Sequence, residues 1–285
     1  RVGDNPALLA AIESSDEVIP LFILDKSQIA EAGEKLLAYM GQSLRSLDQS
    51  LGNKLHIIEG DQVEILRELI DLYKVNEVHI SDEYERYGAQ RDTRVESAGI
   101  KLIRTGSPYA VKPGRVIKES DGTPYRVYTP FFKLWSTLAV NPPVQLLAPA
   151  KPWLEPLECM GRPVARGEMA IRAGEAFALR TLARFIERAI HDYDENRNRA
   201  DLSGTSHLSH ALAHGEIHPR TILASIGDGA GETVFAKEIC WREFYADVLF
   251  RNPDSLHDYY DKRYAQMRYD KGPSAEKKLE AWKRG

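Results

Sequence analysis

The chain has little cysteine and no long apolar run. Its 285 residues include only Cys159 and Cys240, too few for a disulfide scaffold or for a zinc site built from four thiolates. We therefore expect a reducing compartment and predict a cytoplasmic protein. No apolar stretch is long enough to cross a membrane, and the sequence shows no signal-peptide pattern. These absences predict a protein without a membrane partner.

An excess of positive charge is also absent. The formal net charge of −4 provides no overall attraction to nucleic acid, although it leaves room for a local basic patch. Neither the G-x-G-x-x-G pattern nor a P-loop occurs, so no motif supports dinucleotide or nucleoside triphosphate binding. The 43% of apolar and 28% of charged residues are typical of a globular chain, and the length suits one large domain or two ordinary ones.

Short apolar runs and helical patterns alternate over the first 140 residues. The runs predict strands at 17–25, 54–61, 77–84 and 99–107, and apolar residues spaced by three and four predict helices at 35–51 and 61–75. This order predicts a parallel, Rossmann-like sheet with helices on both faces and a ligand site at the carboxyl ends of its strands. The opening GDNPALLAAI starts a helix, capped by Asp4 or Asn5, that no strand precedes. We therefore expect a fragment that lacks its first strand.

The pattern changes near residue 141. Six prolines and little periodicity between 141 and 168 predict a long linker. Helices are predicted beyond it at 174–193, at 206–214, from Pro219 onward and at 234–250. The expected fold is an α/β domain over 1–140, an interdomain linker over 141–170 and the first part of an all-α domain over 171–285.

Four of the eight histidines gather at His207, His210, His214 and His218. On one uninterrupted helix they would share a face, but Gly215 and Pro219 break the helix before the last of them. No Cys, Asp or Glu joins the other three on that face, so a closed zinc site lacks a fourth ligand and we expect no metal. The hydroxyls of Thr205, Ser206 and Ser209 at a helix start instead predict a cradle for a pyrophosphate. A capped structural helix is the alternative.

Five segments resemble the cryptochrome/photolyase family and occur in its order over the whole chain. They are RVGDNPAL (1–8), PYRVYTPFFKLW (124–135), YDENRNRADLSGTSHLS (193–209), GEIHPR (215–220) and EICWREFY (238–245). The resemblance is strongest to the class I enzymes that repair cyclobutane pyrimidine dimers. It implies an antenna domain, a linker and a helical domain that binds FAD. The implied reaction is a blue-light-driven electron transfer from reduced FAD to a dimer flipped out of DNA.

The resemblance also implies roles for single residues. Contacts to FAD are implied for Tyr193, Thr205, Ser206, His207, Leu208, Ser209, Phe235, Glu238 and Arg242. Catalytic contact with the lesion is implied for Glu238 and Trp241, and contact with DNA for these two together with Arg242 and Tyr245. From the residues alone, Phe235 and Trp241 suit a core equally well, and Tyr193 suits the end of an apolar core stripe better than a flavin contact. Likewise, Glu238 and Arg242 suit an exposed helix face.

A second chromophore is implied by the segment DEYERYGAQRD (82–92), which resembles the lining of the family's antenna site. Gly88 stands where folate-binding relatives place a glutamate. This argues against methenyltetrahydrofolate and leaves a deazaflavin, another flavin or no second chromophore. Tyr84, Glu85 and Arg91 also suit an ordinary loop between a strand and a helix.

The function implied is that of a monomeric deoxyribodipyrimidine photo-lyase acting on DNA that contains pyrimidine dimers. A cryptochrome-type blue-light photoreceptor is the first alternative, and a non-enzymatic nucleotide-binding α/β module, which would explain only residues 1–140, is the second. The ending LEAWKRG resembles the family segment just before its largest flavin-binding stretch. We therefore expect 1–285 alone to bind FAD poorly and its own activity to be doubtful.

Overall fold

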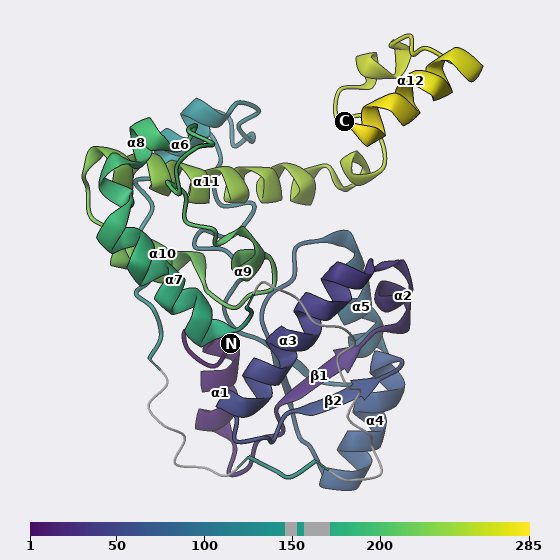
Figure 1. Ribbon diagram of the computed structural model, residues 1–285. Helices are drawn as coiled ribbons and strands as arrows, with labels where there is room; N and C mark the ends of the chain where they lie inside the picture. The colour runs from purple at the N-terminus through teal and green to yellow at the C-terminus, as the bar shows by residue number, and fades with distance from the viewer. Residues whose placement is uncertain (146–152, 157–171) are drawn as a thin grey trace.

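The computed structural model describes residues 1–145, 153–156 and 172–285 (Figure 1). Helices and strands alternate in its first part. They are α1 (Pro6–Ser14), β1 (Leu21–Leu24), α2 (Lys26–Glu31), α3 (Glu34–Ser50), β2 (His56–Glu59), α4 (Gln62–Tyr73), β3 (Val78–Ile80), α5 (Arg86–Ser97) and β4 (Leu102–Arg104). All four predicted strands are confirmed, although each is only three or four residues long, and α1, α3 and α4 are the three predicted helices of this part.

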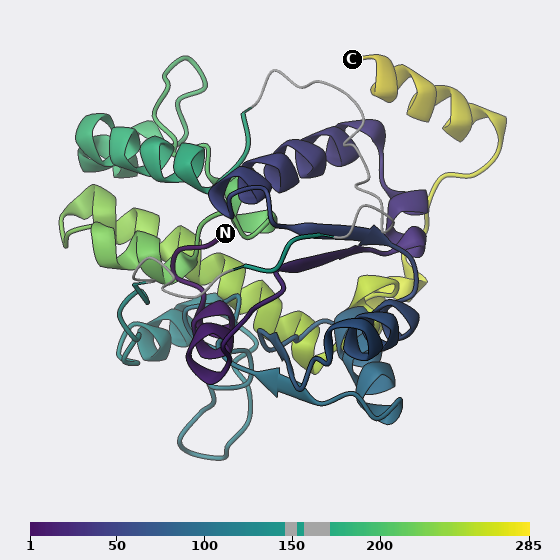
Figure 2. The same cartoon turned by 90° about the horizontal axis from the view of Figure 1, so that it is seen from below.

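The strands form two separate parallel pairs in the part of the chain that the structure describes. β1 pairs with β2, with Leu21 opposite His56, and β3 pairs with β4, with Val78 opposite Leu102. Side chains alternate across β1: Phe22 and Leu24 pack with α3, whereas Leu21 and Ile23 pack with α4. Figure 2 shows α3 and α4 on opposite sides of the first pair. The strands are thus parallel and covered on both faces, as predicted, but they form two pairs.

The first helix shows how its start is fixed. Asn5 is the N-cap, and its side chain accepts a hydrogen bond of 3.2 Å from the backbone N–H of Leu8. Pro6 occupies the first helical position, where its missing N–H costs nothing. Asp4, the other predicted cap, has a left-handed backbone with φ 48° and is buried. Asp4 therefore serves another contact.

The longer elements that the structure describes beyond residue 127 are helices, and Trp153 makes one isolated parallel bridge with Val18. The helices are α6 (Tyr128–Trp135), α7 (Glu175–Arg188), α8 (Tyr193–Asn196), α9 (Ser209–Ala213), α10 (Pro219–Ser225), α11 (Ala230–Arg251) and α12 (Pro273–Arg284), with 3₁₀ turns η2 (Ile190–Asp192), η3 (Pro253–Leu256) and η4 (Lys262–Gln266). Of the linker predicted for 141–170, all but 141–145 and 153–156 lies outside the described residues. No helix in the described ranges is long and apolar enough to span a bilayer.

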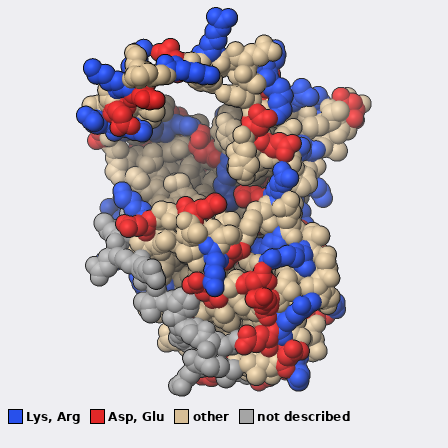
Figure 3. All heavy atoms as spheres, turned by 90° about the vertical axis from the view of Figure 1, so that its right-hand side faces the viewer, with Lys and Arg blue, Asp and Glu red and all other residues tan. Residues whose placement is uncertain are grey.

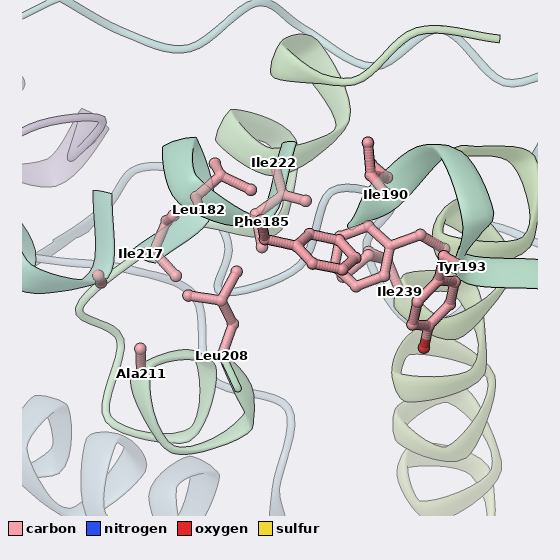
Figure 4. Packing of buried hydrophobic residues seen from close by; sticks show 11 residues of the cluster. Leu182, Phe185, Ile190, Tyr193, Leu208, Ala211, Ile217, Ile222 and Ile239 are labelled. Atoms are coloured by element: carbon pink, nitrogen blue, oxygen red, sulfur yellow. The ribbon is translucent and has the colours of Figure 1, made fainter. Parts of the chain in front are cut away.

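Two predicted helices have different limits from those expected. The helix predicted at 174–193 ends at Arg188, and the chain continues through η2 into α8. This change of direction buries Ile190 and Tyr193 in the core. The helix predicted at 206–214 begins only at Ser209, since His207 has a left-handed backbone with φ 52°. The apolar stripe itself is core, as Figure 4 shows for Leu182, Phe185, Ile190 and Tyr193.

A buried polar cluster joins α1 to the helical part. Asp4 Oδ1 accepts a hydrogen bond from Arg220 Nε at 2.6 Å and Oδ2 accepts one from the Thr221 hydroxyl at 2.7 Å. Beside this pair, His218 Nε2 donates to the backbone oxygen of Ser107, which follows β4, at 2.7 Å. The segments RVGDNPAL and GEIHPR, far apart in sequence, therefore meet in one network that fixes α10 against the start of the chain.

Candidate functional site

The centre of the candidate site is the stacked ring of Trp241 on α11. It lies face to face with Tyr128 of α6, with ring centroids 3.6 Å apart and planes 7° apart, and it stacks more loosely on Tyr245 at 5.6 Å. The Tyr128 hydroxyl donates a hydrogen bond of 2.7 Å to the backbone oxygen of Lys237, one turn earlier on α11. Trp241 is only partly buried, and Tyr245 is exposed. The indole is therefore held firmly while part of it stays accessible.

A charged pair lies one turn before this ring. Glu238 Oε1 accepts a hydrogen bond of 2.6 Å from Arg197 Nη1, and the two side chains are 32% and 30% exposed. The Arg197 guanidinium also lies over the ring of Tyr193, 5.6 Å from its centroid. The hydrogen bond with Glu238 raises the pKa of Arg197, so the guanidinium keeps its positive charge. A carboxylate, a cation and a flat ring thus share one accessible part of α11.

The predicted anion cradle is a loop that leads into α9. Leu208 is buried in the same core as Tyr193 and anchors the loop, and its N–H lies 3.4 Å from the Ser206 hydroxyl (Figure 4). Thr205, His207 and Ser209 are exposed. Within the described residues, the hydroxyls of Thr205 and Ser209 have no hydrogen-bond partner, and no side chain caps the first N–H groups of α9. These open donors at an accessible loop fit a phosphate group.

The two aromatic residues predicted beside a flavin lie in the core. Tyr193 and Phe235 are 7% and 4% exposed and pack against each other with centroids 5.3 Å apart. Phe185 completes the cluster at 4.8 Å from Phe235. Burial raises the pKa of the Tyr193 hydroxyl. Both side chains therefore pack as core residues here, and their contact with a flavin stays a prediction.

Arg242 lies against the loop that follows β4. Its Nη1 donates to the backbone oxygen of Pro108 at 3.3 Å, and its guanidinium lies over the ring of Tyr109 at 4.8 Å. Arg242 is thus partly buried and has partners of its own. These partners are in the loop after β4 and do not include Glu238 or Arg197. Its predicted contacts with FAD and DNA stay predictions.

The sequence analysis missed Glu243, the residue that fixes this loop. Glu243 is buried, and its Oε2 accepts hydrogen bonds from the N–H of Val111 at 2.9 Å and from Trp135 Nε1 at 2.7 Å. Burial raises the pKa of its carboxyl group to about 7. The only signal in the sequence was an acidic residue between aromatic residues in WREFY. This is weak evidence for a buried hydrogen-bond acceptor.

The histidine cluster has a packing role. His210 and His214 lie against the ring of Tyr39 on α3, with centroids 5.2 and 4.5 Å away, and the Tyr39 hydroxyl donates to Glu216 at 2.7 Å. His218 is buried in the network around Asp4. Among the described residues, no group of three or more His, Cys, Asp or Glu side chains could hold a metal ion.

The predicted antenna segment forms an ordered turn into α5. The Tyr84 hydroxyl donates to Asp82 at 3.1 Å, Arg91 pairs with Asp92 at 2.7 Å, and Glu85 occupies the N-cap position of α5. A Cβ atom at position 88 would overlap the side chain of Glu83. A glutamate in place of Gly88 would therefore have to displace Glu83.

Comparison with known proteins assigns the chain to a family. The sequence model of the family described as DNA photolyase matches residues 1–150. A deoxyribodipyrimidine photo-lyase of Synechococcus sp. is 30% identical over 95% of this chain and 62% of its own length. An uncharacterised 31.6 kDa protein from another Synechococcus strain is 31% identical over 86% of this chain and 95% of its own length.

Solved structures agree with this assignment. A bacterial class III photolyase from Agrobacterium tumefaciens matches 100% of this chain and 63% of its own chain, with a TM-score of 0.84 and 28% identity. The chain thus spans somewhat less than two thirds of the photo-lyases that it matches. The resemblance noted in the sequence is confirmed, and the chain belongs to the DNA photolyase family.

Proposed function

We propose that this chain is part of a deoxyribodipyrimidine photo-lyase, a light-dependent enzyme that splits cyclobutane pyrimidine dimers in DNA. The observation that carries the proposal is the arrangement on α11, where the partly accessible Trp241 is stacked on Tyr128 beside Glu238. Relatives named deoxyribodipyrimidine photo-lyase match nearly the whole chain in sequence, which favours repair over a cryptochrome-type photoreceptor. An α/β module that only binds nucleotides would leave these α11 contacts without a role.

The arrangement suits a flipped-out lesion. A pyrimidine ring can pack on the accessible part of the Trp241 indole, and such stacking contributes about 1–3 kcal/mol per base. The Glu238 carboxylate can accept a hydrogen bond from the pyrimidine edge while Arg197 fixes its direction. A damaged base pair is weakly stacked, so the dimer is cheaper to extrude than an intact pair. The exposed Tyr245 would extend this contact along the DNA.

The proposed cofactor is FAD. Thr205, Ser206, His207 and Ser209 would hold its phosphates at the start of α9, while Leu208 anchors that loop in the core. Tyr193, Phe235, Glu238 and Arg242 are the proposed neighbours of the rest of the cofactor. In its reduced state and after absorbing blue light, bound FAD supplies the electron that splits the dimer. The residues of the chain orient the two partners and limit the access of water.

The proposal also covers the domains and a second chromophore. Residues 1–140 would form the antenna domain, 141–170 the linker and 171–285 the first part of the FAD-binding domain. The turn at 82–92 would contact a second chromophore, a deazaflavin or another flavin, because Gly88 stands where folate-binding relatives place a glutamate. A monomeric, cytoplasmic enzyme remains the prediction from the sequence. Positive and negative side chains are interspersed on the face shown in Figure 3, so DNA contact would depend on local residues.

The test compares two tryptophans in the full-length protein to which this chain would belong, purified with FAD. The probe is a DNA duplex with a single cis-syn thymine dimer, and the undamaged duplex is the reference. We expect Trp241→Ala to weaken dimer binding by roughly tenfold or more, since about 1–3 kcal/mol of stacking is lost, with little change for undamaged DNA. Trp282→Ala is the matched control, because Trp282 on α12 is 79% exposed.

Repair under blue light and in the dark completes the experiment. Glu238→Ala should mainly lower the yield of repair per absorbed photon, with a smaller loss of binding, because the carboxylate would steady the charge that develops on the dimer. If Trp241→Ala instead unfolds the protein or removes FAD, the ring is structural and the lesion contact is wrong. If the parent protein binds FAD but repairs no dimer in light, the photoreceptor reading replaces this proposal.

A further inference from the structure

Two buried carboxylates of α11 hold the loop that follows β4. Glu243 and Asp247 lie one turn apart on the helix, and each is only 2% exposed. Glu243 accepts hydrogen bonds from the backbone N–H groups of Ala110 and Val111, and Asp247 accepts one of 2.6 Å from that of Gly114. Carboxylates are buried this deeply only where their oxygens are hydrogen-bonded. These bonds therefore fix the loop to α11 at several points.

Glu243 has the more specific role of the two, because three donors converge on it. Besides the two backbone groups of the loop, Trp135 Nε1 donates to its Oε2 at 2.7 Å. A carboxylate offers acceptors on both of its oxygens, so it can bind all three donors. An amide at the same place would keep one acceptor oxygen and would turn its own N–H groups toward at least one of these donors. A carboxylate is therefore needed at position 243 to hold the loop in place.

The loop in turn holds Arg242, the residue beside Glu243. Arg242 Nη1 donates to the backbone oxygen of Pro108 at 3.3 Å, and its guanidinium lies over the ring of Tyr109 at 4.8 Å. Pro108 and Tyr109 directly precede Ala110, whose N–H is bound by Glu243. The backbone of the loop thus connects Glu243 to Arg242, although one side chain is buried and the other is partly accessible.

Arg242 lies on the face of α11 that carries the candidate site. Positions 238, 241, 242 and 245 have the spacing of a single helix face. Within the described residues, Pro108 is the only hydrogen-bond partner of Arg242, so most N–H groups of its guanidinium are free to bind a ligand. A planar guanidinium with free donors suits a phosphate group, which it can bind through two parallel hydrogen bonds.

We propose that Glu243 is a positioning residue for DNA binding. It fixes the loop that holds Arg242, and Arg242 binds a phosphate of the DNA backbone beside the candidate site. The inference rests on the proposed function, because it takes DNA as the partner of this face of α11. It adds a buried residue that contacts neither DNA nor FAD and yet determines where the phosphate contact forms. A guanidinium that is already in place loses less side-chain freedom when it binds.

The test measures binding to an undamaged DNA duplex by the full-length protein to which this chain would belong, purified with FAD. Arg242→Ala should weaken binding by about tenfold or more. It should also lower the slope of log K against log salt concentration by about 0.9, the value for one phosphate contact. Glu243→Gln should weaken binding by at least about threefold, because the guanidinium is no longer held in place.

The double variant separates positioning from a general loss of stability. In the Arg242→Ala background, Glu243→Gln should cause no further loss of binding, since both changes act on the same contact. A residue that only stabilises the fold would weaken binding equally in both backgrounds. The matched control is Glu232→Gln, which changes another buried carboxylate of α11 whose partner is His191. Its affinity and salt slope should equal those of the parent.

A second variant tests the loop from the other side. Tyr109→Leu removes the ring beneath Arg242 while Glu243 still holds the backbone, and it replaces Glu243→Gln if that variant does not fold. It too should weaken binding only where Arg242 is present.

The outcomes distinguish this inference from the proposed function. If Arg242→Ala leaves the salt slope unchanged, or if the loop variants weaken binding equally with and without Arg242, the inference is wrong. The undamaged duplex needs neither a dimer nor light. If these expectations hold and the protein repairs no dimer, only the proposed repair function is wrong.

Discussion

Tyr128 and Trp241 are joined face to face across the contact between α6 and α11, with ring centroids 3.6 Å apart and planes 7° apart. The same tyrosine donates its hydroxyl hydrogen to the backbone oxygen of Lys237. The ring of Trp241 is thus fixed by a residue more than a hundred positions earlier in the chain. Its orientation is set before any ligand arrives, and this lowers the entropy cost of binding a flat ring.

Replacing Tyr128 should therefore weaken lesion binding, although Tyr128 itself would not contact the lesion. In Tyr128→Leu, loss of the stacked pair should cost about 0.5–1.5 kcal/mol of dimer binding, a few-fold to about tenfold in affinity. Tyr128→Phe keeps the ring and should lose less. Binding of dimer-containing and undamaged duplexes is the measurement, with the exposed Tyr260→Leu as control. Equal dimer affinity in Tyr128→Leu and the parent would show that Trp241 needs no such support.

The pair of Asp4 and Arg220 should be critical for stability. Asp4 is 7% exposed and accepts hydrogen bonds from Arg220 and Thr221. In Asp4→Ala the guanidinium would remain buried without its partner, a loss of about 3–5 kcal/mol in the free energy of unfolding. The matched control is Asp201→Ala, which removes an exposed pair with Arg199 and should leave the stability nearly unchanged. Urea unfolding measures both, and similar losses would contradict the prediction.

His218 should make the protein sensitive to mild acid. Nε2 donates to Ser107 while Nδ1 accepts a hydrogen bond from the N–H of Arg220 at 3.1 Å, so the folded ring is neutral. Burial lowers its pKa from 6.5 to about 4, with Arg1 and Arg220 nearby lowering it and Asp4 raising it. Between these values the unfolded chain binds the proton and the folded one does not. Stability is therefore complete above pH 6.5 and falls as the pH drops toward 4, by about 3 kcal/mol in total.

A glutamine tests this origin of the acid sensitivity. His218→Gln can keep both a donor and an acceptor but cannot titrate, so its stability should change less between pH 6.5 and 4 than that of the parent. His257→Gln, at an exposed position, should leave the parent's pH dependence unaltered. Urea unfolding at several pH values gives the comparison. Parallel curves for the parent and His218→Gln would show that other groups cause the acid sensitivity.

Periodicity predicted the elements of this protein because local burial decides them. The strands and the helices α3, α4 and α11 lie where apolar spacing placed them. The division of the strands into two pairs could not be predicted, since pairing depends on main-chain partners distant in sequence. The end of α7 at Arg188 likewise depends on burying Ile190 against α11, which no local pattern encodes.

The contacts of the candidate site residues could not be predicted from the sequence. Glu238 and Trp241 follow from their spacing on one helix, yet their partners Arg197 and Tyr128 come from other segments. Glu243 was missed because its donors, Trp135 and the backbone near Val111, meet it only in the folded chain. Sequence spacing indicates which residues share a face. It does not indicate what covers that face.

Replacing Gly231 with alanine should destabilise the protein, although the residue lies in a helix. An alanine usually stabilises a helix by about 1 kcal/mol relative to glycine. At position 231, however, a Cβ would overlap the backbone oxygen of Ile190, and it would lie 2.9 Å from that of His191. These are main-chain atoms of η2, which cannot move aside as a flexible side chain can. Overpacking of this kind costs about 1–3 kcal/mol, so the clash should outweigh the gain in helix propensity.

The measurement is urea unfolding of Gly231→Ala beside Gly227→Ala. A Cβ at position 227 would meet no atom within 4 Å, so that variant should be as stable as the parent or slightly more stable. Gly231→Ala should be less stable than the parent by up to about 2 kcal/mol, the clash less the gain in propensity. Because η2 leads directly into Tyr193, Gly231→Ala should also expose the core that Tyr193 and Phe235 share. If Gly231→Ala matches Gly227→Ala in stability, η2 can shift away from α11 at little cost, and the close approach of the two backbones does not fix the site.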